Sequence, residues 1–244
     1  MSLPVFAVDT LPVPGVATLD GPEGKHAATV RRMRAGEQLL LSDGRGGLAT
    51  CEVVEVGKAE LTLNVLDTSQ VRPPRVRVRL AQALVKGDRG ELAVETATEA
   101  GVDTIVPWKA ARCVARWDDG PRGAKALGRW RSAVAQAAKQ ARRPWTPEVT
   151  EPVTTKQLLT VVRQADVAMV LHESATRPLT DVTLPDEGEI LLAVGPEGGV
   201  SDEELTALSE AGAVPVRLGP DVLRASTAAS VALGALGALT SRWS

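Results

Sequence analysis

Three loops in the second half of the sequence combine residue types that could bind and position a small ligand. The first loop, 170–174, reads VLHES; the second, 194–201, reads VGPEGGVS; the third, 218–228, reads LGPDVLRASTA. Each loop follows a short apolar run that is typical of a buried strand. Because open parallel sheets bind their ligands beyond the carboxyl ends of the strands, these loops are the first candidates for a binding site.

The second loop carries three glycines and a proline within residues 195–199. Without Cβ atoms, its backbone can come within hydrogen-bonding distance of a ligand. It does not fit the GxGxxG pattern of dinucleotide sites, and no lysine follows Gly199 as the GxxxxGK[ST] phosphate loop requires. For one such loop an ordinary turn remains the alternative, but three unusual loops at three strand ends favour a ligand site.

The elements that must hold these loops alternate between strand and helix. Apolar runs predict strands at 76–84, 102–107, 167–171, 189–194 and 214–218, and the helical patterns fall at 90–100, 123–143 and 226–242. A further helix is expected after Ser201, because Glu204 three residues later completes the signature of a capping box. The nearly continuous apolar run at 189–194 is typical of a strand buried on both faces of a parallel sheet. The pattern therefore predicts an α/β domain.

The first seventy residues read differently. Residues 37–42, 48–56 and 59–67 alternate apolar with polar side chains and are separated by glycine turns, which predicts a small antiparallel β-barrel. One helix is expected over about 22–33. Two adjacent prolines, Pro73 and Pro74, favour a stiff, extended connection. We therefore place a domain boundary there, with a barrel over 1–72 and the α/β domain over 73–244.

The composition excludes several classes of protein. The chain has 244 residues, 44% of them hydrophobic and 24% charged, which is typical of a packed soluble protein and not of a disordered or collagenous one. No apolar run is long enough to span a membrane, and the N-terminus lacks the pattern of a secretory signal. The two cysteines, Cys51 and Cys113, are far apart, and there are two histidines. We expect reduced thiols, no metal, no membrane and a cytoplasmic location.

The charge distribution points to a nucleic-acid partner. The net charge is −2, yet residues 108–145 contain ten Lys and Arg against two Asp, and residues 181–210 contain nine Asp and Glu and no Lys or Arg. A basic stretch of this density attracts phosphates, although a solvated helix face is the alternative. Four of the five tryptophans lie in the basic stretch, where they could pack in the core or stack on a base. With aromatic residues at 2%, an RRM-like or OB-like stacking platform is not expected.

At this point the motifs resemble those of a known family. HES after a strand, GPEGGVSDEE and LGPDVLRASTAA, together with flanking segments such as HAATVRRMRAGEQLLLSDGRGG, ALVKGDRGELAVETATEAGVDTIVPW and RWRSAVAQAAKQARRPWTPEV, resemble the SPOUT superfamily and, within it, the RsmE family. The resemblance covers nearly the whole chain. It implies S-adenosylmethionine-dependent methylation of N3 of a specific uridine in 16S ribosomal RNA of the small subunit. The family's fold would be a PUA-like RNA-binding barrel followed by an α/β methyltransferase domain with a deep trefoil knot.

The resemblance also implies roles for particular residues. The cofactor S-adenosylmethionine would be bound by Leu171, His172, Glu173, Gly195, Pro196, Glu197, Gly198, Gly199, Leu218, Gly219, Val222, Leu223 and Arg224. We expect Arg224 to stabilise negative charge on the uracil oxygens, or otherwise to anchor the third loop. Glu197 would orient the base or accept its proton, with a structural role in its own loop as the alternative. His172 is more readily a wall of the cofactor pocket than a base.

RNA is expected to contact basic residues from several segments. They are Lys25, His26, Arg31, Arg32, Arg34, Lys86, Arg89, Arg142 and Arg143. The partners implied are 16S rRNA within the 30S subunit and a second copy of the chain, because the family is homodimeric. Small residues in the last helix, from Ala228 to Ala238, would allow close approach of a partner helix, although they could equally pack within one chain.

One position departs from the family pattern. Where the family has Leu-Arg-x-Glu-Thr-Ala before the last helix, Ser226 stands in the Glu position. We expect this serine to cap the last helix. Two other functions remain open from the sequence: a ribose 2′-O-methyltransferase of the same superfamily, and a non-catalytic RNA-binding factor of ribosome assembly.

Overall fold

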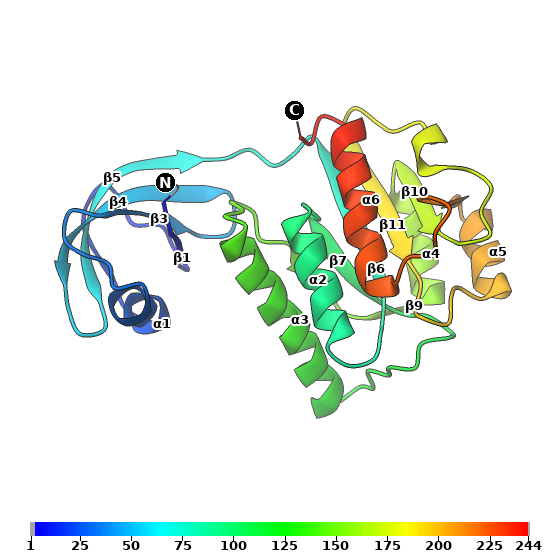
Figure 1. Cartoon of the computed structure of the whole chain (residues 1–244), viewed down its shortest axis with the longest axis horizontal. Coiled ribbons are helices and arrows are strands. Elements are labelled where there is room, and N and C mark those ends of the chain that lie inside the picture. The colour runs from blue at the N-terminus through cyan, green and yellow to red at the C-terminus, as the bar shows by residue number, and fades with distance from the viewer. Residues whose placement is uncertain (1–2, 244) are drawn as a thin grey trace. The chain divides into compact units, whose positions relative to one another are not determined.

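The computed structural model describes residues 3–243 (Figure 1). Its α-carbon contacts divide the chain into two compact units. The first unit contains the chain up to Pro73 together with Ala138–Thr146, and the second contains Pro74–Ala137 and the chain from Pro147 onward. Residues 138–146, expected in the second domain, thus belong to the first unit.

A five-stranded sheet with the order β1-β3-β4-β5-β2 forms the first unit. Its strands are β1 (Val5–Ala7), β2 (Gly15–Leu19), β3 (Gln38–Ser42), β4 (Gly47–Val56) and β5 (Leu61–Gln70). Alternate residues such as Leu39, Leu41 and Leu63 are buried, as the period of two predicts. The three strands predicted here, β3, β4 and β5, pair antiparallel as expected. β1 and β2 are additional strands, and β1 departs from the antiparallel pattern because it runs parallel to β3. A parallel pair needs a long connection, and the chain between β1 and β3 supplies it with β2 and a helical segment.

The helical segment of the first unit consists of α1 (Gly21–Lys25) and a π-helical turn, η1 (His26–Val30). The helix expected over 22–33 is therefore present, but it ends three residues early. Arg32 has a φ of 53°, and the Met33 amide donates to the carbonyl of Ala27 at 3.1 Å. A residue in this left-handed conformation ends a helix.

The long basic helix α3 (Pro121–Gln140) ends in the same way. The amide of Arg143 donates to the carbonyl of Ala138 at 2.8 Å, that of Arg142 donates to Lys139 at 3.1 Å, and Arg142 has a φ of 55°. This is the hydrogen-bond pattern of a Schellman motif. The helix expected over 123–143 thus stops before Pro144 is reached.

Two side-chain contacts explain why residues 138–146 belong to the first unit. The Nζ atom of Lys139 lies 2.6 Å from Oε2 of Glu23, and both side chains are mostly buried. The indole N–H of Trp145 donates to the carbonyl of Val71 at 3.1 Å. Both contacts are long-range in sequence, so the composition of the segment could not reveal them.

The second unit contains a seven-stranded sheet in which every recorded pair is parallel. The order is β12-β10-β11-β6-β7-β8, with β9 also paired to β7. The strands are β6 (Val76–Ala83), β7 (Thr104–Lys109), β8 (Glu148–Val149), β9 (Val153–Thr154), β10 (Val167–Leu171), β11 (Gly188–Val194) and β12 (Val214–Val216). The five strands predicted from apolar runs are confirmed, and β8 and β9 are additional.

Helices cover both faces of this sheet. They are α2 (Arg89–Glu99), α4 (Thr155–Gln164), α5 (Asp202–Glu210) and α6 (Ala225–Leu239), besides α3 and a short 3₁₀ turn, η2 (Leu179–Asp181). Val78 and Leu80 of β6 pack with residues of α2, α3 and α6, whereas Ala81 and Ala83 pack with residues of α4 and α5. Figure 1 shows α6 lying beside α2. No helix in residues 3–243 is long and apolar enough to cross a membrane.

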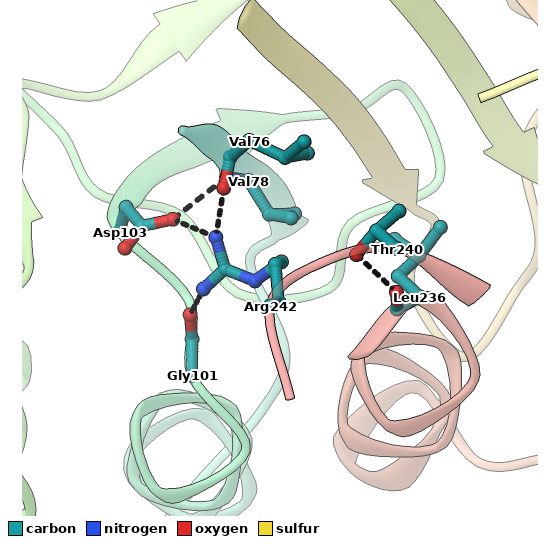
Figure 2. A network of polar contacts seen from close by, with 7 residues as sticks. All are labelled: Val76, Val78, Gly101, Asp103, Leu236, Thr240 and Arg242. Carbon is teal, nitrogen blue, oxygen red and sulfur yellow. Dashed lines mark hydrogen bonds and ion pairs between the residues drawn. The ribbon is translucent and has the colours of Figure 1, made fainter. Parts of the chain in front are cut away.

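The chain after α6 is tied back to the start of the unit, as Figure 2 shows. The guanidinium of Arg242 lies 2.7 Å from Oδ2 of Asp103 and also donates to the carbonyls of Val76 and Gly101. The same carboxylate oxygen accepts a hydrogen bond from the amide of Val78 at 2.8 Å. Both charged side chains are nearly buried, at 7% and 13% exposure. This ion pair therefore fixes the end of α6 to β6 and to the turn before β7.

Candidate functional site

The three loops singled out in the sequence meet at one edge of the second sheet. β12, β10 and β11 are neighbours and all parallel, so their carboxyl ends lie side by side. One pocket at this edge is lined by ten of the residues expected to bind cofactor: Leu171, His172, Glu173, Gly195, Pro196, Gly199, Leu218, Gly219, Val222 and Leu223. An adjoining pocket is lined by the other three, Glu197, Gly198 and Arg224. The structure thus brings all thirteen together.

The glycine-rich loop after β11 is tightly folded. A Cβ atom added to Gly195 would lie 2.7 Å from Cγ2 of Val200 and 3.2 Å from its backbone nitrogen. Gly199 has a φ of 73°, and its amide donates to the carbonyl of Pro196 at 2.9 Å. A glycine is therefore needed at 195 for packing and at 199 for conformation.

The predicted capping box at the start of α5 is confirmed. The hydroxyl of Ser201 accepts from the amide of Glu204 at 3.2 Å, and the Glu204 carboxylate accepts from the amide of Ser201 at 3.3 Å. The backbone amide of Glu203 and the Ser201 hydroxyl hold the pKa of the Glu203 carboxyl below its usual value. These bonds fix the glycine-rich loop at its C-terminal end.

His172 lies directly after β10, where its amide donates to the carbonyl of Val216 at 3.0 Å. The backbone amide of Ser174 donates to Nδ1 of His172 at 3.3 Å, and the Ser174 hydroxyl lies 2.8 Å from the same nitrogen. A ring nitrogen that accepts a hydrogen bond carries no proton, so in the neutral ring the proton is on Nε2. The geometry makes His172 a hydrogen-bond donor in the pocket wall.

The adjoining pocket brings together charged residues that are far apart in sequence. Nη1 of Arg89 lies 3.8 Å from Oε1 of Glu197, and these side chains are 54% and 34% exposed. Arg224 lines the same pocket, and within residues 3–243 its guanidinium has no ion pair or hydrogen bond, including none with Asp221. Arg89 was expected to bind RNA and Glu197 to act on the base, so their contact is new information from the structure.

Ser226 does not cap the last helix, contrary to expectation. The helix α6 begins at Ala225, which makes Arg224 the residue at the N-cap position, and Ser226 lies in the first turn. Ser226 is 4% exposed and lines the same pocket as Arg224. Ser226 lies two residues after the N-cap position, which Arg224 occupies. Its hydroxyl therefore cannot accept from the first helical amides in the way that an N-cap side chain does.

The basic residues expected to contact RNA fall into both units. Lys25, His26, Arg31, Arg32, Arg34, Arg142 and Arg143 belong to the first unit, and Lys86 and Arg89 belong to the second. All except His26 and Arg143 are exposed. Arg32 and Arg142 are the two described non-glycine residues with positive φ. Such a conformation is uncommon for a side chain of this size.

Two of the tryptophans in the basic stretch belong to the core. Trp108 is 0% exposed and Trp130 is 2% exposed. Trp117 packs edge-on against Trp130, with ring centroids 4.9 Å apart. Neither buried ring is accessible to a base, so the core-packing alternative holds for both.

The cysteines are free thiols, buried at Cys51 and half-buried at Cys113. Burial raises the pKa of the Cys51 thiol to about 11 and also raises the pKa of Cys113, where backbone hydrogen bonds offset part of the effect. Neither thiol is thereby activated as a nucleophile. Within residues 3–243 no group of three or more His, Cys, Asp or Glu side chains is arranged to hold a metal.

One residue of the site was missed from the sequence. Arg112, in the loop after β7, donates from Nη1 to the carbonyls of Gly198 at 3.2 Å and Val200 at 3.5 Å. It was read only as part of the basic stretch. No spacing rule links residue 112 to a loop almost ninety residues later, so the sequence carried no signal for this contact.

Comparison with known proteins gives a consistent result. A profile described as an RNA methyltransferase domain matches residues 72–237, and one described as an RNA methyltransferase PUA domain matches residues 19–66. Ribosomal RNA small subunit methyltransferase E of Mycobacterium tuberculosis is 54% identical, covering 98% of this chain and 93% of that protein. The enzyme of the same name from Bacillus subtilis is 31% identical, covering 90% and 88%.

Solved structures agree with these sequence relatives. A methyltransferase E from Neisseria gonorrhoeae bound to S-adenosylmethionine is 27% identical, has a TM-score of 0.84 and covers 98% of both chains. A Legionella pneumophila protein in complex with the same cofactor is 31% identical, has a TM-score of 0.87 and covers 98% of this chain and 99% of that one. The parallel sheet, its three-loop pocket and these likenesses define an RNA methyltransferase with a PUA-like N-terminal domain. More narrowly, the chain belongs to the ribosomal RNA small subunit methyltransferase E family.

Proposed function

We propose that this protein uses S-adenosylmethionine to methylate N3 of a uridine in the 16S RNA of the small ribosomal subunit. The observation that carries the proposal is the meeting of all three predicted loops at one pocket on the carboxyl edge of β10, β11 and β12. The family relationship supplies the reaction class, and the resemblance of the loop motifs supplies the target atom.

The pocket has the chemistry that this cofactor requires. Leu171, Leu218 and Leu223 offer apolar walls, and the glycine backbone at 195 and 199 allows the chain to approach a ligand closely. Exposed backbone groups at the loop edges can bind the polar atoms of an adenosine. When bound, S-adenosylmethionine supplies a methyl group on a sulfonium, which needs no further activation by the protein.

The adjoining pocket is assigned to the acceptor base, because it shares Pro196, Gly199 and Leu223 with the cofactor pocket. A base held there lies next to the methyl donor, and alignment of two reactants accounts for a large part of such a rate enhancement. Arg224, whose guanidinium is unpaired within residues 3–243, can donate to a uracil oxygen as negative charge develops.

Glu197 is the residue assigned to the N3 proton. Its carboxylate lines the same pocket as Arg224 and is one-third exposed, so a base or a bridging water can reach it. Arg89 at 3.8 Å supplies a nearby positive charge. His172 is assigned to the wall of the cofactor pocket, since its Nδ1 already accepts from Ser174 and only a donor remains.

The first unit, which comprises the chain up to Pro73 and Ala138–Thr146, is assigned to RNA binding as a PUA-like domain, and the second unit is assigned to methyl transfer. Two arginines, Arg32 and Arg142, stand at helix ends where glycine would relieve the positive φ. A long cationic side chain at such a position is consistent with a contact to phosphate. Since the substrate is ribosomal RNA, we place the protein in the cytoplasm.

The knot and the dimer belong to the same proposal. β12 lies at one edge of the sheet, yet the next element, α6, packs on α2 and β6. The backbone of Arg217, directly after β12, forms hydrogen bonds with the backbones of Arg177 and Leu179. The segment between β10 and β11 therefore lies against the chain that leads from β12 to α6, as a trefoil crossing requires. The small residues of α6 mostly pack within the chain, with Ala229 and Ala232 fully buried. A dimer face is therefore proposed on the exposed apolar residues around the third loop and α6, namely Val222, Val231 and Leu239.

Methyl transfer to isolated subunits tests this function. Purified protein would be incubated with methyl-labelled S-adenosylmethionine and small subunits from a strain that lacks the modification, with large subunits as the matched control. Label should appear in 16S RNA and not in 23S RNA. Cofactor binding by calorimetry without transfer to either subunit would instead indicate a binding protein, and the proposal would be wrong.

A further inference from the structure

The glycine-rich loop is held from outside the two pockets by one side chain. Nη1 of Arg112 donates to the carbonyls of Gly198 at 3.2 Å and Val200 at 3.5 Å. A Cβ atom added to Gly198 would lie 3.3 Å from Cβ of Arg112, so the two backbones pack closely. Arg112 is not among the residues that line either pocket. Arg112 thus bonds to two loop residues that line the pockets, Gly198 and Val200, without lining a pocket itself.

The backbone next to Arg112 is itself anchored. The amide of Ala111 donates to Oε1 of Glu204 at 2.8 Å, and the hydroxyl of Thr155 donates to the same oxygen at 2.6 Å. Thr155 in turn accepts from the indole N–H of Trp108 at 3.1 Å. Glu204 is 6% exposed and is the carboxylate of the capping box that ends the loop.

These contacts form one connected network between the end of β7 and the glycine-rich loop. The Glu204 carboxylate fixes the backbone at Ala111, and the arginine that follows reaches back to the carbonyls at 198 and 200. The loop is thus bound at its C-terminal end by the capping box and at its centre by a guanidinium. Hydrogen bonds from a charged donor are stronger than neutral ones.

We propose that Arg112 is a positioning residue for the cofactor, which fixes the glycine-rich loop in its binding conformation and does not serve as an RNA contact. The inference rests on the proposed function, because it assigns the loop to S-adenosylmethionine. A planar guanidinium can donate to two carbonyls at once, whereas a lysine ammonium on a flexible stem holds two such acceptors less well. Without Arg112 the loop must be ordered when the ligand binds, which weakens binding and leaves the chemical step intact.

The test compares Arg112→Ala and Arg112→Lys with the full-length protein. Arg116→Ala is the matched control, because it removes one exposed positive charge from the same segment. In the described part of the chain, the Arg116 side chain makes no hydrogen bond or ion pair with the loop. Calorimetry with S-adenosylmethionine measures the dissociation constant. Amide hydrogen exchange over 196–201 without cofactor measures the order of the loop. Single-turnover methylation at saturating cofactor separates binding from chemistry, and circular dichroism verifies the fold.

For Arg112→Ala we expect a dissociation constant raised roughly tenfold, faster exchange over 196–201 and a single-turnover rate within threefold of the parent. Arg112→Lys should recover part of the affinity, and Arg116→Ala should bind cofactor as the parent does. Unchanged cofactor affinity and exchange in Arg112→Ala, with weakened RNA binding, would overturn the inference and make Arg112 an RNA contact. If the parent protein bound no cofactor, the proposed function would be wrong, while the exchange data would still test whether Arg112 orders the loop.

Discussion

Replacing Gly195 by alanine should strain the glycine-rich loop by a predictable amount. The added Cβ would lie 2.7 Å from Cγ2 of Val200, well inside van der Waals contact, and 3.2 Å from the Val200 amide nitrogen. Val200 is 2% exposed and β-branched, so its side chain cannot rotate away freely. Overpacking of this kind costs about 1–3 kcal/mol, which for a chain of this size lowers Tm by roughly 2–12 °C.

Binding should suffer to the extent that the free loop relaxes from its close-packed form. Restoring that form in the complex costs the part of the strain so released, which lowers S-adenosylmethionine affinity by up to about a hundredfold. Gly219→Ala is the control for stability, since a Cβ there meets nothing within 4 Å and the residue needs no positive φ. Its Tm should not fall.

A double-mutant cycle tests the cause. Val200→Ala alone should destabilise the protein by removing buried methyl groups, but in combination with Gly195→Ala it should recover part of the lost Tm, because the clashing Cγ2 is gone. Thermal unfolding and calorimetry of the four proteins give the coupling. Additive effects on Tm, or an unchanged Tm in Gly195→Ala, would refute the argument from packing.

Three further outcomes are expected. Arg224→Lys should lower the single-turnover rate on the order of 100-fold and leave cofactor affinity within a few-fold, because an ammonium does not reproduce the guanidinium fork. A normal rate would exclude a catalytic role for Arg224, and a large loss of cofactor affinity would make Arg224 an anchor of the third loop. Arg242→Ala should lower the free energy of unfolding by about 3–5 kcal/mol, because it leaves the nearly buried Asp103 without this cation. Denaturant titration measures this free energy, and a loss below about 1 kcal/mol would contradict the burial of the ion pair. Burial raises the pKa of Cys51 from 9.0 to about 11, so the unfolded chain loses this proton first; the contribution of this thiol to stability should be constant below about pH 9 and be lost towards pH 11. In Cys51→Ala this part of the decline in the free energy of unfolding should disappear, and a pH profile identical to that of the parent protein would contradict it.

Local signals in the sequence predicted much of the second unit. The apolar runs predicted β6, β7, β10, β11 and β12, and Ser201 with Glu204 predicted the start of α5, because strand burial and helix capping depend on residues close together in the chain. The three loops came together because parallel neighbours end at the same edge of a sheet. α4 was missed, although Thr154 and Gln157 form a capping box there. That pattern could have revealed the helix.

Features that depend on distant contacts could not be predicted. β8 and β9 have two residues each, too few to show a period of two. The parallel pairing of β1 with β3 and the bonds from Arg112 to the glycine-rich loop join segments with no recognisable relation in sequence. The proposed cap at Ser226 failed because the backbone turns into α6 at Ala225, and a serine is compatible with either position.

The identity of the methylated nucleoside decides whether this protein transfers a methyl group to N3 of uracil. Small subunits lacking the modification would be treated with the purified protein and S-adenosylmethionine, and their 16S RNA digested to nucleosides and separated by liquid chromatography with mass spectrometry. We expect one new species, 3-methyluridine, which should be absent when Gly195→Val protein is used. A 2′-O-methylated nucleoside would contradict the assignment of the uracil N3 atom as acceptor, and the absence of any methylated product would contradict the proposed activity itself.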